Sequence, residues 1–361
     1  MSCASITFLT DIPSPYQVEL LGAVARDFPD AVRAIFLRSS AGARLWQTPS
    51  INFQHCYLDR DGFEPATRWT RASDLVVFGS YAALPIQRLM WLRLRTGRAW
   101  AFWGERPGAN RRNRLGRALR AAAQLPVRLM PIPVWGVGAW AIEGYKREIG
   151  GNRLFLNVPY FSDLSPYFAI ERKHNPRSAV TKFLFSGSLI NRKGVDLLAE
   201  AFLALITSGA EAELTFIGTG PLEKALRDAT RPVSARVSFC GFKQWHELPK
   251  IYAAHDVLCA PSRYDGWGLV VPEGLAAGMP VIATEAMGSA RDMLTSKSGW
   301  VVRGGDASPL FEAMRAAVRQ SPAQRRAMIE RGREAARQHH IEAGVRRVWE
   351  AISQTLAACR A

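Results

Sequence analysis

The second half of the chain carries two acidic and two basic residues in an arrangement that could bind an anion. Asp265 and Glu273 stand eight positions apart, and a Gly-Trp-Gly run follows the first acid directly. Arg192 and Lys193 precede a segment with helical periodicity. Cationic side chains beside the free N–H groups that begin a helix suit a phosphate, and glycines let the backbone approach a ligand closely. These residue types predict a site for a phosphate-bearing molecule.

Four loops could line that site, because each follows an apolar, strand-like run. Ligands of open parallel sheets bind beyond the carboxyl ends of the strands. A single glycine after a strand usually serves only the turn, but four such loops in order favour a binding site. Neither half opens with a Gly-x-Gly-x-x-Gly run, which argues against a dinucleotide cofactor. The four loops span 187–194, 218–221, 241–242 and 262–269.

The segments that must position these loops alternate between strand-like and helix-like patterns. Such alternation predicts a doubly wound parallel sheet. In the second half the expected strands are 181–187, 212–218, 237–241, 256–262, 280–284 and 298–302, and the expected helices are 194–206, 220–229, 245–255, 272–278, 322–338 and 341–358. In the first half the expected strands are 5–10, 31–37, 74–79, 99–104 and 131–138, and the expected helices are 16–28, 82–95 and 139–150.

Length and composition indicate two folded α/β domains in tandem. The 361 residues exceed one typical domain, and 48% are hydrophobic against 22% charged. A linker rich in Pro, Ser and charged residues lies at 165–178. We expect an N-terminal domain over 1–172, a C-terminal domain over 173–345 and a helical tail over 346–361.

The cysteines and histidines exclude some classes of site. The five cysteines are scattered, without the spacing of a disulfide framework or a zinc site. No signal peptide or spanning helix is visible, so we expect a cytoplasmic protein. The six histidines do not cluster, and neither a bound metal nor a bound cofactor is expected.

The net charge of +16 indicates either an anionic partner or a large solvated basic surface. Arginines mixed with Leu, Met and Trp at helical spacing can lie on an anionic membrane surface, and an ordinary solvated helix face accounts for the same pattern. No aromatic and basic RNA-binding motif is present, so nucleic acid is not an expected partner. The arginines in question are Arg88, Arg93, Arg95, Arg98, Arg111, Arg112, Arg114, Arg117 and Arg120.

Four blocks of the second half occur in an order and spacing that a known family shares. They are "FLFSGSLINRKGVDLLAEAF", "FIGTGP", "VSFCGF" and "PSRYDGWGLVVPEGLAAGMPVIAT". They resemble the G-R-L-x-x-x-K-G block, the G-x-G-P turn, the strand before the base pocket and the E-x7-E element of the retaining glycosyltransferases of family four, also called group 1. In the first half the resemblance rests on "DIPSPYQVELL", "FGSY" and "VPYFSD".

The resemblance implies a GT-B fold, in which two Rossmann-like domains face each other and a C-terminal helix packs on the N-terminal domain. It implies a nucleotide-sugar donor, a UDP- or GDP-sugar, with Lys193 on the diphosphate, Asp265 on the donor sugar and Glu273 on the ribose hydroxyls. The further donor-binding residues that it implies are Gly187, Ser188, Arg192, Gly218, Gly220, Gly241, Phe242, Gly266, Trp267, Gly268 and Leu269.

Three positions depart from the family pattern. The first acid of the E-x7-E element is Asp265, which is one methylene shorter than Glu. The usual Arg of the first block is Ser188, and whether Arg192 replaces its charge is open. The loop after the first strand is "DIPSPYQ" rather than a glycine-rich loop.

The implied reaction moves the donor sugar to a polysaccharide or lipid-linked glycan, with retention of anomeric configuration and without a metal. Tyr16 and Glu105 are candidate acceptor contacts, and a membrane-peripheral location would suit a lipid-linked acceptor. Asp265 as a covalent nucleophile is a less favoured mechanism. The alternatives are a GT-B sugar phosphorylase or nucleotide-sugar epimerase, a non-catalytic GT-B paralogue that binds a donor without turnover, and a protein that only binds an anionic surface.

Overall fold

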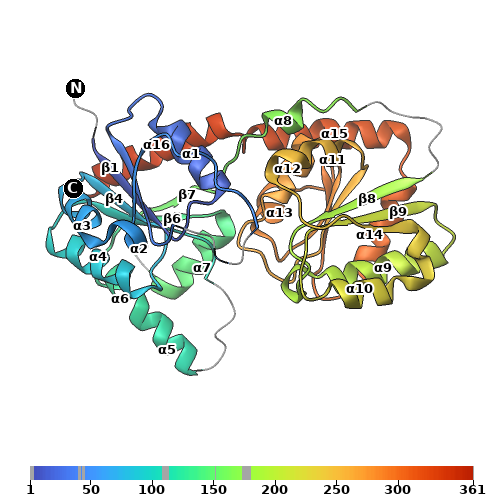
Figure 1. Cartoon of the computed structure of the whole chain (residues 1–361), viewed down its shortest axis with the longest axis horizontal. Coiled ribbons are helices and arrows are strands. Elements are labelled where there is room, and N and C mark those ends of the chain that lie inside the picture. Colours follow the sequence, from blue (N-terminus) through green and yellow to red (C-terminus); the bar gives the residue numbers. More distant parts are fainter. Residues whose placement is uncertain are drawn as a thin grey trace. The chain divides into compact units, whose positions relative to one another are not determined.

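The fold is described from a computed structural model, for residues 4–39, 42, 45–107, 114–150, 152–172 and 180–360. Contacts divide the chain into two compact units (Figure 1). Unit 1 comprises Met1–Ser162 and Ile341–Ala361, and unit 2 comprises Asp163–His340. The divisions follow residues 162 and 340, ten and five residues before the expected boundaries at 172 and 345. Each unit contains one parallel sheet, so the expected class of two α/β domains is confirmed.

The sheet of unit 1 has seven parallel strands. They are β1 (Ile6–Thr10), β2 (Val32–Phe36), β3 (Gln54–Tyr57), β4 (Leu75–Phe78), β5 (Trp100–Gly104), β6 (Val134–Gly136) and β7 (Phe155–Asn157). Their order is β3-β2-β1-β4-β5-β6-β7, so the direction of winding reverses between β1 and β4. All residues of β1, β4 and β5 are buried, as expected for strands that helices cover on both faces.

Helices cover the sheet of unit 1, and the last helix of the chain is one of them. The helices are α1 (Pro15–Ala25), α2 (Leu58–Asp61), α3 (Phe63–Ala72), α4 (Leu84–Arg95), α5 (Arg114–Ala123), α6 (Leu125–Leu129), α7 (Ala139–Ile149) and α16 (Ile341–Ala358). Figure 1 shows α16, in red, beside α1. The indole Nε1 of Trp135 in β6 donates to Thr355 Oγ1 in α16 at 3.0 Å, and both side chains are buried. The expected packing of the C-terminal helix on the N-terminal domain is therefore confirmed.

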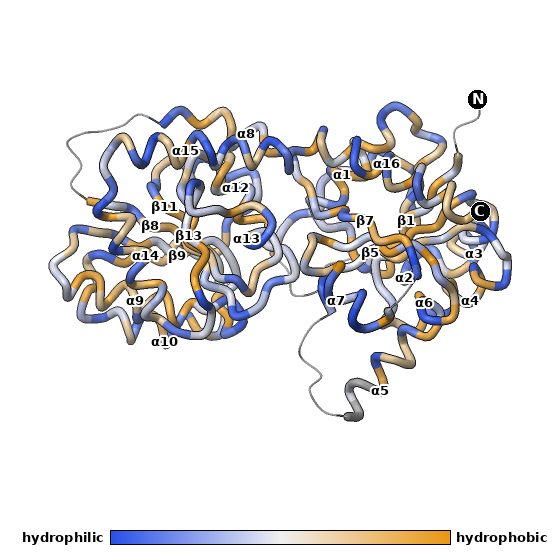
Figure 2. Tube along the Cα trace, turned by 180° about the vertical axis from the view of Figure 1, so that it is seen from behind, coloured by the Kyte–Doolittle hydropathy of each residue, from blue (hydrophilic) through white to orange (hydrophobic). Residues whose placement is uncertain are grey.

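The sheet of unit 2 has six parallel strands. They are β8 (Thr181–Ser186), β9 (Ala212–Ile217), β10 (Val237–Phe239), β11 (Val257–Ala260), β12 (Val281–Thr284) and β13 (Gly299–Val302). Their order is β10-β9-β8-β11-β12-β13, with the reversal of winding between β8 and β11. Figure 2 shows hydrophobic residues along the strands of both sheets and hydrophilic residues on the outer sides of many helices.

The helices of unit 2 lie on both faces of its sheet. They are α8 (Ser165–Phe168), η1 (Asn191–Lys193), α9 (Val195–Thr207), α10 (Glu223–Ala229), η2 (Arg231–Arg236), η3 (Trp245–Glu247), α11 (Leu248–Ala253), α12 (Val270–Ala276), α13 (Gly288–Met293), α14 (Ser308–Val318) and α15 (Pro322–Arg337), where η marks a 3-10 helix. In Figure 1, α9, α10 and α14 cover one face and α11, α12 and α15 the other.

The start of the expected linker is a folded part of unit 2. Helix α8 places the ring of Tyr167 against Tyr252 of α11, with 5.2 Å between the ring centroids. The guanidinium of Arg172 donates to the carbonyl oxygens of Tyr252 and Ala277. Composition alone does not reveal such packing, because Ser and Pro are favoured at the starts of helices as well as in turns. The remainder of the expected linker, 173–179, lies outside the described residues.

Candidate functional site

Lys193 and Asp265 meet at the point where the winding of the unit 2 sheet reverses. Lys193 ends η1, in the connection after β8, and Asp265 stands in the loop after β11. The strands β8 and β11 are neighbours whose connections diverge, and ligands of open parallel sheets bind beyond the carboxyl ends of the strands at such a point. The Nζ of Lys193 donates to Oδ2 of Asp265, and the two side chains are only 16% and 13% exposed. The structure thus brings together two of the three charged residues that are expected to contact the diphosphate, the donor sugar and the ribose.

Arg192 lies beside this pair but is more exposed. Its Nη1 is 3.8 Å from Oδ1 of Asp265 and donates to the carbonyl oxygen of Tyr264 at 2.9 Å. Its side chain is 45% exposed. Ser188, which stands where the family has Arg, is exposed beyond the end of β8. Arg192 therefore supplies a second cation next to Asp265.

Glycines allow the loops after β8, β9 and β10 to pack directly on one another. A Cβ atom on Gly218 would lie 1.9 Å from the carbonyl oxygen of Gly187, and one on Gly220 would lie 2.4 Å from that of Leu189. The N–H of Gly218 donates to the carbonyl oxygen of Gly241 at 2.8 Å. Close approach between backbones thus explains the glycines at 218 and 220, and the structure assembles three of the four expected loops into one surface.

Arg263 ties the connection after β8 to the loop after β11. Its guanidinium makes two hydrogen bonds to the carboxylate of Asp196, at 2.6 and 2.7 Å, and a third to the carbonyl oxygen of Asn191 at 2.8 Å. The hydrogen bond from Arg263 holds the pKa of Asp196 below its usual range. A Cβ on Gly194 would lie 2.0 Å from the carbonyl oxygen of Pro261. The segment that carries Lys193 is therefore fixed to the segment that carries Asp265.

The loop from Gly266 to Leu269 presents backbone N–H groups beside Asp265. Among the described residues, the N–H groups of Gly266, Trp267, Gly268 and Leu269 have no acceptor. Trp267 anchors the loop, because its side chain is 1% exposed and stacks on the ring of His339 with 5.6 Å between centroids. The indole Nε1 is buried and has no hydrogen-bond partner in the described chain.

Glu273 lies in the first turn of α12 and is held by a buried tyrosine. The hydroxyl of Tyr252 donates to Oε2 of Glu273 at 3.1 Å. Tyr252 is fully buried, and burial together with the charge of Glu273 raises its pKa well above the usual value. A tyrosine that keeps its proton remains a donor, so it fixes one oxygen of the carboxylate. Phe242, expected at the base pocket, is half-buried directly after Gly241, whose φ is +66°.

In unit 1 the two expected acceptor contacts lie near a common partner. The rings of Tyr16 and Tyr160 are 4.8 Å apart between centroids. Burial, with Tyr16 and the charge of Glu105 nearby, raises the pKa of Tyr160 well above its usual value. The hydroxyl of Tyr145 donates to the backbone carbonyl of Glu105 at 2.8 Å. The carboxyl ends of β1 and β5 thus bring Tyr16 and Glu105 toward Tyr160.

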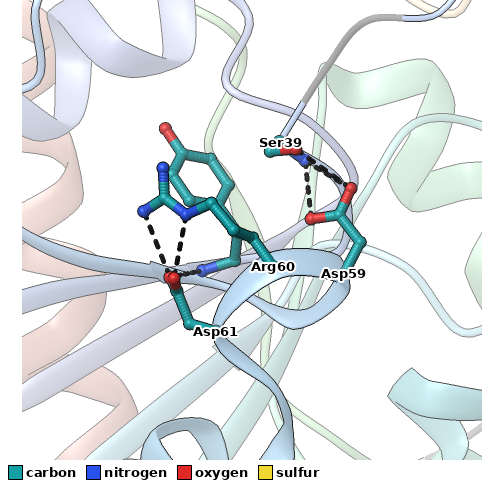
Figure 3. Close-up of polar contacts among 5 residues, drawn as sticks. Ser39, Asp59, Arg60 and Asp61 are labelled. Atoms are coloured by element: carbon teal, nitrogen blue, oxygen red, sulfur yellow. Dashed lines mark hydrogen bonds and ion pairs between the residues drawn. The ribbon is translucent and has the colours of Figure 1, made fainter.

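Asp59 and Asp61 form an Asp-x-Asp pair, a spacing that could hold a divalent cation. The expectation of no bound metal does not account for this pair. Figure 3 shows that they turn to different partners. Asp59 accepts from the N–H and hydroxyl of Ser39, at 2.9 to 3.1 Å. Asp61 accepts from Arg60 and from the N–H of Tyr57, both at 2.8 Å. Within the described residues, no group of three or more His, Cys, Asp or Glu residues could hold a metal ion.

The arginine-rich segments divide between interior and surface. Arg93 is fully buried, and its guanidinium donates to the carbonyl oxygens of Thr70 and Ala99. Arg120 forms an ion pair with Glu148 at 2.7 Å. These two residues are therefore poor candidates for a membrane-facing surface. Arg88, Arg95 and Arg98 are exposed.

The other arginines of these segments fall outside what can be described. Arg111 and Arg112 lie outside the described residues, as do the side chains of Arg114 and Arg117. None of the helices that the structure describes combines the length and hydrophobicity that a bilayer-spanning segment needs.

Three residues that contact expected site residues or their loops were not expected from sequence: Tyr252 and Arg263 in unit 2, and Tyr160 in unit 1. Arg263 directly precedes the Tyr-Asp-Gly run, and Tyr160 lies in the "VPYFSD" block. Both residues could have been found from the sequence, because each lies in or beside a block that resembles the family. Tyr252 lies in a helix of its own, and only the fold brings it to Glu273.

Residues 180–320 match the family model described as glycosyl transferases group 1. A GDP-mannose-dependent monoacylated alpha-(1-6)-phosphatidylinositol monomannoside mannosyltransferase of Corynebacterium glutamicum is 27% identical over 61% of this chain and 59% of its own length. A sulfoquinovosyl transferase of Arabidopsis thaliana is 32% identical over 35% of this chain and 25% of its own length. The chain thus spans less than two thirds of these relatives.

Solved structures share the fold over nearly the whole chain. The Anabaena HepE protein in complex with UDP has a TM-score of 0.76 at 15% identity and covers 97% of this chain and 100% of its own. A glycosyltransferase from Rickettsia africae has a TM-score of 0.75 at 12% identity and covers 98% and 99%. The family match places residues 180–320 among the group 1 glycosyltransferases, and the solved structures show the fold of the chain, which is two parallel-sheet α/β domains of the GT-B type.

Proposed function

We propose that the protein transfers a sugar from a UDP- or GDP-sugar to a glycan or lipid-linked acceptor, with retention of anomeric configuration and without a metal. The observation that carries this proposal is the meeting of Lys193, Asp265 and the loop 266–269 at the reversal point of the unit 2 sheet. Glu273 stands close by in sequence, at the start of α12. One cation, a run of backbone N–H groups and a carboxylate fit the diphosphate and ribose of a nucleotide sugar.

The main chemical task of such a site is to stabilise the leaving group. When a nucleoside diphosphate departs, negative charge grows on its β-phosphate, and fixed charges and N–H groups aimed at that charge lower the barrier. Lys193 and the N–H groups of 266–269 take this role. Asp265 contacts the donor sugar, Glu273 accepts hydrogen bonds from the ribose hydroxyls, and the base lies against Gly241 and Phe242.

The acceptor is a glycan or a lipid-linked glycan that reaches the carboxyl edge of the unit 1 sheet at Tyr16 and Glu105. Support comes from relatives whose names state lipid-linked or lipopolysaccharide acceptors, such as the corynebacterial mannosyltransferase and a lipopolysaccharide core mannosyltransferase of Rhizobium meliloti. The exposed Arg88, Arg95 and Arg98 suit a cytoplasmic protein that binds the surface of an anionic membrane.

A second candidate is a non-catalytic paralogue that binds a donor without turnover. Two observations favour it: Ser188 replaces a diphosphate cation, and Asp265 is shorter than the usual Glu and is already paired with Lys193. It predicts saturable nucleotide binding with no hydrolysis or transfer of the sugar. A protein that only binds anionic surfaces predicts, in contrast, binding that weakens steeply with salt and does not select one nucleotide.

The test combines a ligand screen with two variants. Thermal shift against UDP, GDP, ADP and their sugars is expected to show saturable stabilisation by one nucleotide family. Lys193→Ala and Glu273→Ala should each lower donor affinity or turnover by about tenfold or more, as the loss of a hydrogen bond to a charged group does. Lys182→Ala and Glu213→Ala, which remove an exposed pair with 3.9 Å between Nζ and Oε2, are matched controls. If donor hydrolysis and sugar transfer are unchanged in both site variants, the proposal is wrong.

A further inference from the structure

A buried serine in helix α13 makes hydrogen bonds to the backbone carbonyl groups of the loop 266–269. Ser289 is the second residue of α13 and is fully buried. Its Oγ lies 2.7 Å from the carbonyl oxygen of Trp267 and 2.8 Å from that of Gly268. Its backbone N–H also donates to the carbonyl oxygen of Trp267, at 3.0 Å. The hydroxyl proton is therefore shared between two consecutive carbonyl groups of the loop.

This sharing determines where the N–H groups of the loop point. A peptide unit is planar and trans, so the C=O of one residue and the N–H of the next point in opposite directions. Because the carbonyls of Trp267 and Gly268 turn toward Ser289, the N–H groups of Gly268 and Leu269 point away from it. Neither N–H has an acceptor within the described part of the chain.

The segment before Ser289 also lies directly against the loop. The N–H of Asp265 donates to the carbonyl oxygen of Ala286 at 2.9 Å, and the N–H of Gly288 donates to that of Asp265 at 3.3 Å. A Cβ on Gly288 would lie 2.4 Å from the carbonyl oxygen of Gly266. The backbone of 286–289 therefore fixes the position of the loop, and the hydroxyl of Ser289 fixes the orientation of its peptide groups.

We propose that Ser289 is a positioning residue of the donor site, which orients the N–H groups of Gly268 and Leu269 toward the β-phosphate of a nucleoside diphosphate. The inference rests on the proposed function, because it assumes that the loop meets the donor diphosphate. Ser289 itself does not touch the ligand and acts through the two carbonyls.

Ser289→Ala removes the hydroxyl without leaving either carbonyl unpaired. The carbonyl of Trp267 keeps the bond from the N–H of residue 289, and that of Gly268 keeps a bond from the N–H of Val271 at 3.2 Å. The variant is therefore expected to fold. Ser298→Ala is the matched control, because Ser298 is also buried, at 2% exposure, and its hydroxyl accepts from the N–H of Thr295 at 3.0 Å in the turn before β13.

The measurement is the affinity for nucleotides with and without a β-phosphate: UDP against UMP, and GDP against GMP, by calorimetry. For the pair that the wild type binds, Ser289→Ala should weaken diphosphate binding about tenfold and change monophosphate binding less than about twofold, as loss of one hydrogen bond to a charged group would do. Ser298→Ala should change neither.

An unchanged ratio of diphosphate to monophosphate affinity in Ser289→Ala would overturn the inference, whether both affinities stay the same or both fall together. In that case diphosphate binding that still depends on Lys193 would leave the proposed function standing. A wild-type protein that binds none of the four nucleotides would overturn the proposed function, and this inference with it.

Discussion

Lys193 and Asp265 neutralise each other at the reversal point of the unit 2 sheet: the ammonium group donates to the carboxylate, and both side chains are mostly buried. An anion that approaches Lys193 therefore competes with a carboxylate of the protein itself. Arg192, 3.8 Å from the other carboxylate oxygen, adds a second positive charge to the same acid. Under the proposed function, the affinity for a diphosphate depends on how the carboxylate is shared between two cations and the donor sugar.

Asp265→Asn should strengthen binding of the nucleoside diphosphate and weaken sugar transfer. The substitution keeps the size of the side chain and removes a like charge close to the phosphate, which is worth about 1 kcal/mol at a dielectric constant between those of protein and water, or about fivefold in affinity. Calorimetry with UDP and GDP and a transfer assay measure the two effects. Asp228→Asn, in an exposed pair with Lys224, is the control. Weaker diphosphate binding in Asp265→Asn would contradict the competition.

Tyr252→Phe should weaken diphosphate and monophosphate binding by the same factor, about three- to tenfold. The substitution removes the hydroxyl that donates to Glu273 and keeps the ring against Tyr167. Because Glu273 is assigned to the ribose, which both nucleotides carry, the loss should not depend on the β-phosphate. Calorimetry with each nucleotide pair measures it, and a loss confined to the diphosphate would show that Glu273 does not hold the ribose.

Trp267→Phe should preserve most activity, whereas Trp267→Ala should not. The indole Nε1 has no hydrogen-bond partner in the described chain, so a phenyl ring keeps the apolar contact and leaves no polar atom without its former partner. Alanine would leave a cavity beside His339 and lower the free energy of unfolding by about 3 to 5 kcal/mol. Chemical denaturation and a transfer assay on both variants provide the comparison. Equal losses in Trp267→Phe and Trp267→Ala would mean that the indole N–H matters.

Arg263→Gln should destabilise unit 2 by about 1 kcal/mol and reduce turnover. The two hydrogen bonds to Asp196 are well aligned, but the side chains are 28% and 43% exposed, so solvent screens much of the attraction. A double-mutant cycle with Asp196→Asn isolates the coupling energy. Turnover should fall because the segment that carries Lys193 is less firmly held. Additive effects on both stability and turnover would count against this connection.

Acidification below about pH 6.5 should destabilise unit 2 through His255. Burial lowers the pKa of this imidazole below its usual value of 6.5. Its Nδ1 lies 2.8 Å from the carbonyl oxygen of Ile251 and its Nε2 lies 2.9 Å from Thr215 Oγ1, which suits a neutral ring with the proton on Nδ1. The unfolded chain binds a proton near pH 6.5 and the folded chain does not, so the free energy of unfolding falls as the pH drops through that value.

The check on His255 is a melting experiment at pH 7.5 and pH 5.5. The wild type should lose more of its melting temperature on acidification than His255→Asn does. His246→Asn, at an exposed position, should behave as the wild type. If the three proteins lose the same number of degrees, another group is responsible for the acid sensitivity.

Apolar runs predicted most strands of both sheets, and the exceptions are short or polar. Strand β3 reads Gln-His-Cys-Tyr and β7 has three residues, and each is defined by pairing with its neighbour in the sheet. The spacing of arginines in the sequence of α4 predicted that Arg93 lies on a charged face of the helix. In the structure, the guanidinium of Arg93 donates to backbone carbonyl groups in the interior. Periodicity indicates which residues share a helix face, and it does not reveal acceptors contributed by other segments.

The proximity of Lys193 and Asp265 was predictable, because both residues lie in loops that follow strands. Since β8 and β11 are neighbours in the sheet, these two loops meet at the same edge. Residues that hold the site residues in position through hydrogen bonds were not predictable in this way. Tyr252 and Ser289 are separated along the chain from the residues they hold, and neither belongs to a motif with a known spacing. Their roles depend on tertiary packing and became visible only with the fold.

The return of α16 to unit 1 sets an order for folding during synthesis. Unit 2 is continuous, from Asp163 to His340, so all its residues have emerged from the ribosome before α16 does. Unit 1 starts first but cannot bury Trp135 against Thr355, or cover α1, until α16 has emerged. N-terminal domains generally fold first during translation, but here the N-terminal unit is the last to complete its core. A ribosome that stalls before α16 emerges would leave apolar surface of unit 1 exposed to chaperones.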